Sequence, residues 1–101
     1  MEVTVSGKHL EVTEPIRTFA EEKALRLPKF FDRVSAVEIV IDKTDSHTYG
    51  TEVIAHVDGA KHFVASGTNG DLYTCIDETV HRVERQLHEH KEKRRNHKHH
   101  S

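Results

Sequence analysis

The chain has 101 residues, the length of one folded domain. Apolar residues make up 35% of the sequence and charged residues 32%, and because the apolar residues recur periodically, the composition excludes an intrinsically disordered chain. One cysteine excludes an intramolecular disulfide framework, and no apolar run is long enough for a membrane span or a secretory signal. We therefore expect a small, soluble, cytoplasmic α+β domain without membrane association.

The formal net charge of −2 is the sum of two unlike parts. Residues 1–60 hold 7 Lys/Arg and 11 Asp/Glu, whereas residues 61–101 hold 8 Lys/Arg and 6 Asp/Glu. From residue 91 onward, five basic residues stand against the single acid Glu92, and five of the ten histidines lie between residues 88 and 100. We therefore expect a cationic C-terminal end, whose charge increases when its histidines are protonated.

A strand and a helix are predicted first. Residues 2–6 alternate apolar and polar side chains, and Gly7 interrupts the alternation, which predicts a strand. Thr13 then offers an N-cap, and Pro15 is tolerated in the first turn of a helix. Pro28 is expected to end or kink this helix because it lacks the N–H donor for the preceding turn. The predicted buried stripe, spaced by three and four residues, is Ile16, Phe19, Ala20, Ala24 and Leu27.

Three further strands are predicted in the middle of the chain. Residues 36–42 and 49–57 alternate apolar and polar side chains, which indicates strands with one buried face. Asp58-Gly59 is a strong hairpin signal, because both residues tolerate positive φ, and residues 61–66 return as the next strand. Residues 67–70 are expected to form a loop.

A second, longer helix is predicted to open at Asp71 and to reach Lys93 or beyond. Its apolar residues step by 4, 4, 3 and 4 and form one continuous seam: Leu72, Ile76, Val80, Val83 and Leu87. The element order is then β-α-β-β-β-α. An α+β fold follows, with a four-stranded, mainly antiparallel sheet and two helices packed on one of its faces.

Catalytic patterns are weak. Ser66, His62 and Asp71 are the right residue types for a hydrolytic triad, but no nucleophile-elbow sequence surrounds any serine. Cys75 lies beside the apolar seam of the second helix, which indicates a small buried thiol rather than a nucleophile. We therefore expect no enzymatic activity and no cofactor.

A specific metal site is not predicted either. Among the C-terminal histidines only His97 and His100 have a usual ligand spacing, and no companion cysteine or carboxylate cage is apparent. A flexible, His-rich tail would bind transition metals weakly without that being its purpose.

Basic residues on both helices favour nucleic acid as a partner. Lys23 and Arg26 share a face of the first helix and Lys29 follows it, whereas Arg82 and Arg85 lie on the second. Solvated helix surface is the ordinary explanation of such cations. Two helices that present them side by side would instead form a positive groove able to follow a phosphate backbone. Because no aromatic ladder or RNP-like strand accompanies them, we expect recognition of the backbone and shape of structured RNA rather than base stacking.

Two segments resemble the ribosome hibernation-promoting factor family, also known as the protein-Y ribosome-associated inhibitor or sigma-54 modulation protein family. Residues 6–17, SGKHLEVTEPIR, are similar to its opening motif. Residues 71–77, DLYTCID, and residues 82–87, RVERQL, resemble its second-helix signature. The similarity covers residues 2 to 93 and identifies the chain with the short form of the family.

This resemblance implies a fold similar to double-stranded RNA-binding domains, with no enzymatic activity. It further implies binding to the small ribosomal subunit and its rRNA, in the channel that receives mRNA and tRNA. Occupying that channel would block translation initiation in stressed or stationary cells. No DNA partner is implied. A separate ribosome-dimerisation factor is a further candidate partner, because the second domain that pairs ribosomes in longer relatives is not expected here.

The resemblance also implies which residues contact RNA. The positions that match the basic contacts of the family in the first part are Lys8, Arg17, Lys23, Arg26 and Lys29. Those in the second part are Arg82, Arg85, Lys91 and Lys93, to which the basic tail adds Arg94. The expected division is a ribosome-binding domain over residues 1–93 and a flexible, basic, His-rich tail over residues 94–101.

Three alternatives remain open. A general module for structured RNA would bind generic duplex RNA as well as it binds small subunits. A protein-binding regulator of transcription would be indifferent to salt and to RNase. A metal-handling protein built on the histidine tail would lose its activity after truncation behind Lys93.

Overall fold

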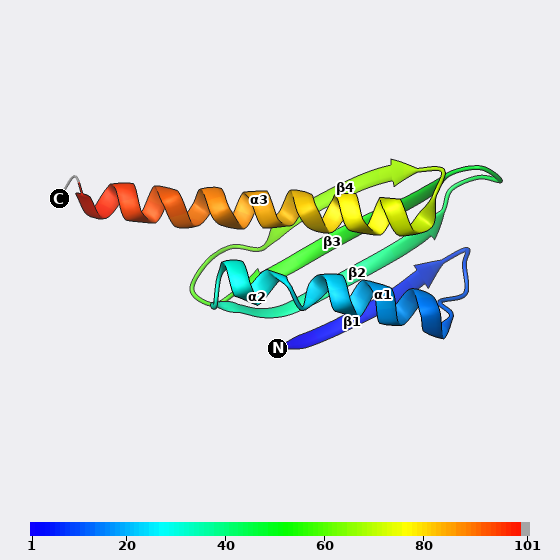
Figure 1. Cartoon of the computed structure of the whole chain (residues 1–101), viewed down its shortest axis with the longest axis horizontal. Coiled ribbons are helices and arrows are strands. Elements are labelled where there is room, and N and C mark those ends of the chain that lie inside the picture. The colour runs from blue at the N-terminus through cyan, green and yellow to red at the C-terminus, as the bar shows by residue number, and fades with distance from the viewer. Residues whose placement is uncertain (100–101) are drawn as a thin grey trace.

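The structure is a computed structural model that describes the backbone of residues 1–99 and the side chains of residues 1–29 and 31–93. One sheet is covered on one face by helices (Figure 1). Its strands are β1 (Glu2–Lys8), β2 (Val34–Lys43), β3 (Tyr49–Val57) and β4 (Phe63–Asn69). The helices are α1 (Glu14–Ala24), α2 (Leu27–Phe30) and α3 (Leu72–His99). The predicted β-α-β-β-β-α order is confirmed, with α2 as a short additional helix.

The sheet is mixed, with the strand order β1-β2-β3-β4. β1 pairs with β2 in parallel, whereas β2 with β3 and β3 with β4 are antiparallel, so the sheet is mainly antiparallel, as expected. Alternation along each strand gives one covered face and one open face. Val37, Ile39 and Val53 are fully buried on the covered face, whereas Glu52 of β3 is exposed on the open face.

α1 ends three residues earlier than the buried stripe of the sequence suggests. Pro28 has no N–H to donate to the carbonyl of Ala24, and its ring would clash with that carbonyl, so α1 stops at Ala24. α2 then begins at Leu27 and places Pro28 in its first turn, where proline is tolerated. Leu27 is nevertheless fully buried, as predicted. Thr13 occupies the N-cap position of α1, but its side chain makes no capping hydrogen bond.

β4 continues beyond its predicted end. Gly67, Thr68 and Asn69, which were expected in a loop, pair with Thr51, Gly50 and Tyr49 of β3. A propensity argument fails here because pairing with a long neighbouring strand overrides the loop preference of glycine and asparagine. The hairpin before β4 turns at Asp58-Gly59 as predicted, and Gly59 has a φ of 73°.

Asp71 opens α3, as predicted. Its carboxylate accepts hydrogen bonds from the hydroxyl of Thr74 at 2.5 Å and from the backbone N–H of Thr74 at 3.0 Å. These bonds, the hydroxyl bond first, hold the pKa of the Asp71 carboxyl below its ordinary value. The carboxylate also lies at the positive end of the helix dipole. α3 is thereby fixed at its first turn.

α3 buries the predicted apolar seam against β3 and β4 and packs beside α1. Its helical backbone continues to His99, past the expected boundary at Lys93, and its C-terminal part projects beyond the sheet (Figure 1). Residues 94–99 are therefore helical in the structure, whereas residues 100 and 101 of the expected tail lie outside the described residues. The division into a ribosome-binding domain and a tail stays a prediction.

Candidate nucleic-acid interface

One flank of α3 is bonded to the outer edge of β4. The guanidinium of Arg82 donates a hydrogen bond to the carbonyl of Ser66 at 2.5 Å, and the amide of Gln86 donates one to the carbonyl of Val64 at 3.0 Å. The distance between the two side chains along α3 matches the distance between the two carbonyls along β4, because four residues of a helix and two residues of a strand both advance about 6 to 7 Å. The two side chains therefore satisfy carbonyls that an edge strand would otherwise leave open.

Gly67 permits this close approach. A Cβ atom at Gly67 would lie 2.9 Å from Nη1 of Arg82 and 3.0 Å from the hydroxyl of Thr79. The absence of a side chain on β4 at this point leaves the path of the Arg82 guanidinium free. The position of Arg82 is thus determined by the backbone of β4 as well as by the helix that carries it.

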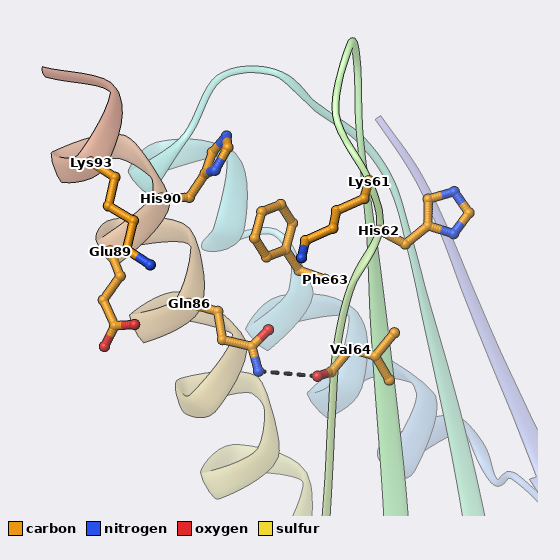
Figure 2. A pocket seen from close by; sticks show the side chains of 8 residues that line it. All are labelled: Lys61, His62, Phe63, Val64, Gln86, Glu89, His90 and Lys93. Carbon is orange, nitrogen blue, oxygen red and sulfur yellow. Dashed lines mark hydrogen bonds between the residues drawn. The ribbon is translucent and has the colours of Figure 1, made fainter. Parts of the chain in front are cut away.

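Two adjoining hollows lie along this edge, and together we name them the β4–α3 groove. The lysine hollow, about 430 Å³, is lined by Lys61, His62, Phe63, Val64, Gln86, Glu89, His90 and Lys93 (Figure 2). The arginine hollow, about 400 Å³, is lined by Ala65, Ser66, Arg82, Arg85, Gln86 and Glu89. The two hollows share Gln86 and Glu89 as lining residues and therefore adjoin each other.

The β4–α3 groove is cationic. Lys61, Lys93 and Arg85 are exposed and have no ion-pair partner within the part of the chain that the structure describes. The Arg82 guanidinium, which has five N–H donors, uses one of them on Ser66 and keeps its charge. Glu89 is the one acid that lines either hollow among the described residues. Four cations against one acid make a surface suited to a polyanion.

Lys23 on α1 and Arg26, which lies between α1 and α2, are arranged differently. Nζ of Lys23 lies 3.1 Å from a carboxylate oxygen of Asp77 on α3, and Nε of Arg26 lies 3.6 Å from a carboxylate oxygen of Glu84. The space between the two helices, where the sequence suggested a positive groove, is therefore crossed by ion pairs. Arg85 and Lys93, which have no ion-pair partner among the described residues, instead line the β4–α3 groove.

The remaining predicted contact residues are scattered over the surface. Arg17 approaches the carbonyl of Val5 on β1 at 3.5 Å, which ties α1 to that edge of the sheet. Lys8 is exposed at the end of β1 and lines a third hollow, across the end of the sheet, together with Arg82. Lys29 on α2 and Lys91 on α3 are exposed. The prediction for Arg94 lies outside the described side chains. The RNA-binding roles of all ten residues stay predictions.

Sequence reasoning missed two residues of the groove, Lys61 and Gln86. Lys61 stands alone between the hairpin turn and β4, so no cluster of basic residues marks it. Gln86 is uncharged, and only the register between α3 and β4 shows that its amide satisfies Val64. The one feature of the sequence that could have indicated Lys61 is its position directly before an edge strand.

Other candidate chemistries find little support in the described residues. No three His, Cys, Asp or Glu side chains there gather as a metal site would require. Cys75 is buried, as predicted, and accepts a hydrogen bond from the hydroxyl of Thr51 at 3.2 Å. Tyr73 packs edge-on against Phe19, with 5.0 Å between the ring centroids, so it has a packing role at the start of α3.

A sequence profile described as "Sigma 54 modulation protein / S30EA ribosomal protein" matches residues 3–95. The chain belongs to this family. Two curated relatives are both named Ribosome hibernation promoting factor. The protein from Azotobacter vinelandii is 38% identical over 93 residues, which are 92% of this chain and 85% of the relative. The protein from Escherichia coli strain K12 is 33% identical over 97 residues, which are 96% of this chain and all of the relative.

Two solved structures have a similar fold. A ribosomal subunit interface protein from Coxiella burnetii superposes with a TM-score of 0.81 at 21% identity, over 90% of this chain and 98% of that one. The N-terminal domain of Protein Y from Thermus thermophilus superposes with a TM-score of 0.79 at 27% identity, over 88% and 98%. Both support the fold described above.

The resemblance stated from the two sequence segments is thus confirmed. The family is one of ribosome-binding factors rather than enzymes, which agrees with the expected lack of catalysis. In the described part of the chain, no helix carries an apolar stretch of the length needed to cross a bilayer.

Proposed function

We propose that this protein is a ribosome-associated hibernation factor of the cytoplasm. It binds rRNA of the small ribosomal subunit in the channel for mRNA and tRNA, and it blocks initiation in stressed or stationary cells. Membership of the family and the names of its relatives support the ribosome as the partner. A separate ribosome-dimerisation factor is proposed as a further partner.

The observation that carries the RNA part of the proposal is the β4–α3 groove. Four cations, Lys61, Arg82, Arg85 and Lys93, follow one edge of the molecule, and Arg82 and Lys93 are separated by about 16 Å along the helix axis. Each phosphate that such cations neutralise releases condensed counterions, which is the main source of affinity for a nucleic-acid backbone. The groove provides charge and shape for contacts with the backbone of RNA.

The mechanism is steric. The protein makes and breaks no covalent bond. It occupies the path of mRNA and tRNA, and its cations hold rRNA phosphates. Preorganisation supports the binding, since Arg82 is held by the carbonyl of Ser66 before RNA arrives. Initiation resumes when the protein dissociates.

Competition on isolated small subunits tests the proposal. Wild-type protein is expected to displace labelled mRNA and initiator tRNA. Arg85→Glu is expected to compete roughly 10-fold less well, because a phosphate contact is replaced by a repulsion. Lys43→Glu is the matched control, since Lys43 is an exposed cation at the end of β2 whose ammonium lies 6.0 Å from the ring centroid of Tyr49, outside the groove. Equal competition by both variants would refute the assignment of the groove, and no displacement by wild type would refute the function.

A further inference from the structure

Two histidines on the open face of the sheet are in contact where the β3–β4 hairpin turns. Nε2 of His62 lies 3.0 Å from Nδ1 of His56 on β3, and the two ring centroids are 4.0 Å apart. The other ring nitrogen of His56, Nε2, lies 2.5 Å from a carboxylate oxygen of Glu38 on β2. The three side chains therefore form one chain of hydrogen bonds with His56 in the middle.

This chain ties the hairpin loop, residues 58–62, to the sheet. None of the five loop residues pairs in the ladder between β3 and β4. The first half of the loop is held by backbone hydrogen bonds that the N–H groups of Asp58 and Ala60 donate, at 2.9 and 3.2 Å. In the part of the chain that the structure describes, the contact between His62 and His56 is the side-chain hydrogen bond of the second half. The position of that half therefore depends on the histidine pair.

The number of protons on the two rings determines whether this contact forms. A neutral imidazole has one N–H donor and one acceptor nitrogen, whereas a protonated imidazole has two donors and no acceptor. When both rings are neutral, His56 donates to the carboxylate of Glu38 through Nε2 and accepts from His62 through Nδ1. When only His56 is protonated, its Nδ1 becomes the donor, and Nε2 of His62 accepts in the other tautomer. When both rings are protonated, two N–H groups of like charge face each other, and the hydrogen bond is lost.

The surrounding charges bear on both protonation steps. The carboxylate of Glu38 stabilises a proton on His56, because it accepts the hydrogen bond from that ring. A second proton enters His62 beside a cationic ring. Figure 2 shows the His62 ring and the side chain of Lys61 on opposite sides of the segment that carries them. The charged residues of the loop, of the lysine hollow that His62 also lines, and of β1 beyond β2 are Asp58, Lys61, Glu89, Lys93 and Glu2.

We propose that the His56–His62 pair is a proton-sensitive latch on the hairpin loop. The latch is closed while the pair has at most one added proton, and it opens when both rings are protonated. Opening releases the second half of the loop from β3, whereas the ladder between β3 and β4 stays paired. Lys61 belongs to the released segment, so the latch also determines how firmly this residue is positioned. The latch is a property of the folded chain and does not depend on the proposed function.

NMR relaxation of the full chain at about pH 7.5 and about pH 5, near the two ends of the range in which histidines titrate, tests the latch. Backbone order parameters of residues 59–62 are expected to fall from about 0.85, the value of rigid backbone, to below about 0.6 in the acidic sample. Order parameters in β3 and α3 are expected to stay unchanged. Imidazole nitrogen shifts are expected to show both rings of the pair protonated in the acidic sample.

Three variants separate the latch from other effects of acid. His56→Phe/His62→Phe retains two aromatic rings that can pack edge-on but cannot be protonated, so its loop is expected to stay ordered at both pH values. His62→Ala removes the contact, and its loop is expected to be mobile at both. His9→Gln removes a histidine–carboxylate contact with Asp42 at the opposite end of the sheet, and it is expected to respond as wild type does.

The latch is refuted if the wild-type loop has the same order parameters at both pH values, whether it is ordered or mobile. It is also refuted if the loop of the double phenylalanine variant loosens in acid as much as the wild-type loop. Loosening of β3 and α3 together with the loop would show that acid acts on the whole fold, which would overturn the proposal as well. None of these measurements involves ribosomes or RNA, so failure of the latch and failure of the proposed function are distinguishable.

Discussion

Arg26, which the resemblance predicts to contact RNA, forms an ion pair within the fold. Its guanidinium lies 3.6 Å from Glu84, whose side chain is only 6% exposed, and the second oxygen of that carboxylate lies 3.2 Å from the ring of His81. A buried carboxylate without a counter-charge is costly, whereas an exposed arginine loses little by pairing. The sequence identified Arg26 as a cation on a helix face. In the structure it lies between α1 and α2, and only the packing of this segment beside α3 gives it Glu84 as a partner.

Arg26→Gln is therefore expected to destabilise the fold by about 1–2 kcal/mol, a value reduced because the arginine is half exposed. The midpoint of thermal unfolding should fall by about 5–10 °C in a domain of this size. Lys29→Gln, at an exposed lysine with no ion-pair partner among the described residues, should stay within about 0.5 kcal/mol of wild type. Equal stability of the two variants would show that the buried carboxylate of Glu84 does not need the charge of Arg26.

Asp71 makes stability dependent on pH through the first turn of α3. Hydrogen bonds from Thr74 lower the pKa of its carboxyl in the folded state below the ordinary 3.8. Its contribution is thus complete above that ordinary value and is lost as the pH falls through the lowered pKa. Asp71→Ala should be less stable than wild type near pH 7, and the difference should shrink near pH 3. Asp71→Asn is the control, because its side-chain amide can cap α3 but does not titrate between the two pH values. Urea unfolding at both pH values measures this, and a difference that is unchanged near pH 3 would contradict it.

Whole elements were more predictable than their ends. The period of two in residues 36–42 and 49–57 and the seam of the second helix identified β2, β3 and α3, because burial on one face imposes those periods. The ends depend on partners elsewhere. β4 extends to Asn69 because β3 offers backbone groups to pair with, and α1 stops at Ala24 because Pro28 cannot donate to it.

The turn after β1 provides a test at the scale of an element. A Cβ atom at Gly7 would lie 2.4 Å from the backbone carbonyl oxygen of Leu10, so the turn must open to admit a side chain. Gly7→Ala is expected to lower the free energy of unfolding by about 1–3 kcal/mol. At Gly50, also in a strand, the nearest atom, in the side chain of Thr44, is 3.5 Å away, and Gly50→Ala should change stability by less than about 0.5 kcal/mol. Chemical denaturation of both variants decides this, and a Gly7→Ala protein as stable as wild type would refute the close approach.

The candidate interface was predictable only in part from the sequence. Arg82, Arg85 and Lys93 were identified through the basic helix and the resemblance, and the structure places them along one groove. Lys61 was missed because its position beside α3 depends on the β3–β4 hairpin. The pairing of Lys23 and Arg26 with acids of α3 was also missed, because a sequence shows charges but not which of them meet.

The whole molecule has a nearly neutral charge and a cationic edge, and this asymmetry determines how its central interaction should respond to salt. Binding through about four phosphate contacts should weaken on the order of 100-fold between about 50 and 200 mM monovalent salt. Generic duplex RNA offers the same phosphates without the shape of the channel, so it should compete poorly.

Co-sedimentation of the purified protein with small subunits across a salt series, with duplex RNA as competitor, tests the account most directly. We expect saturable, near-stoichiometric binding that weakens steeply with salt and that excess duplex RNA does not displace. Binding that duplex RNA displaces readily would indicate a general RNA-binding module, and no binding to small subunits at low salt would contradict the account.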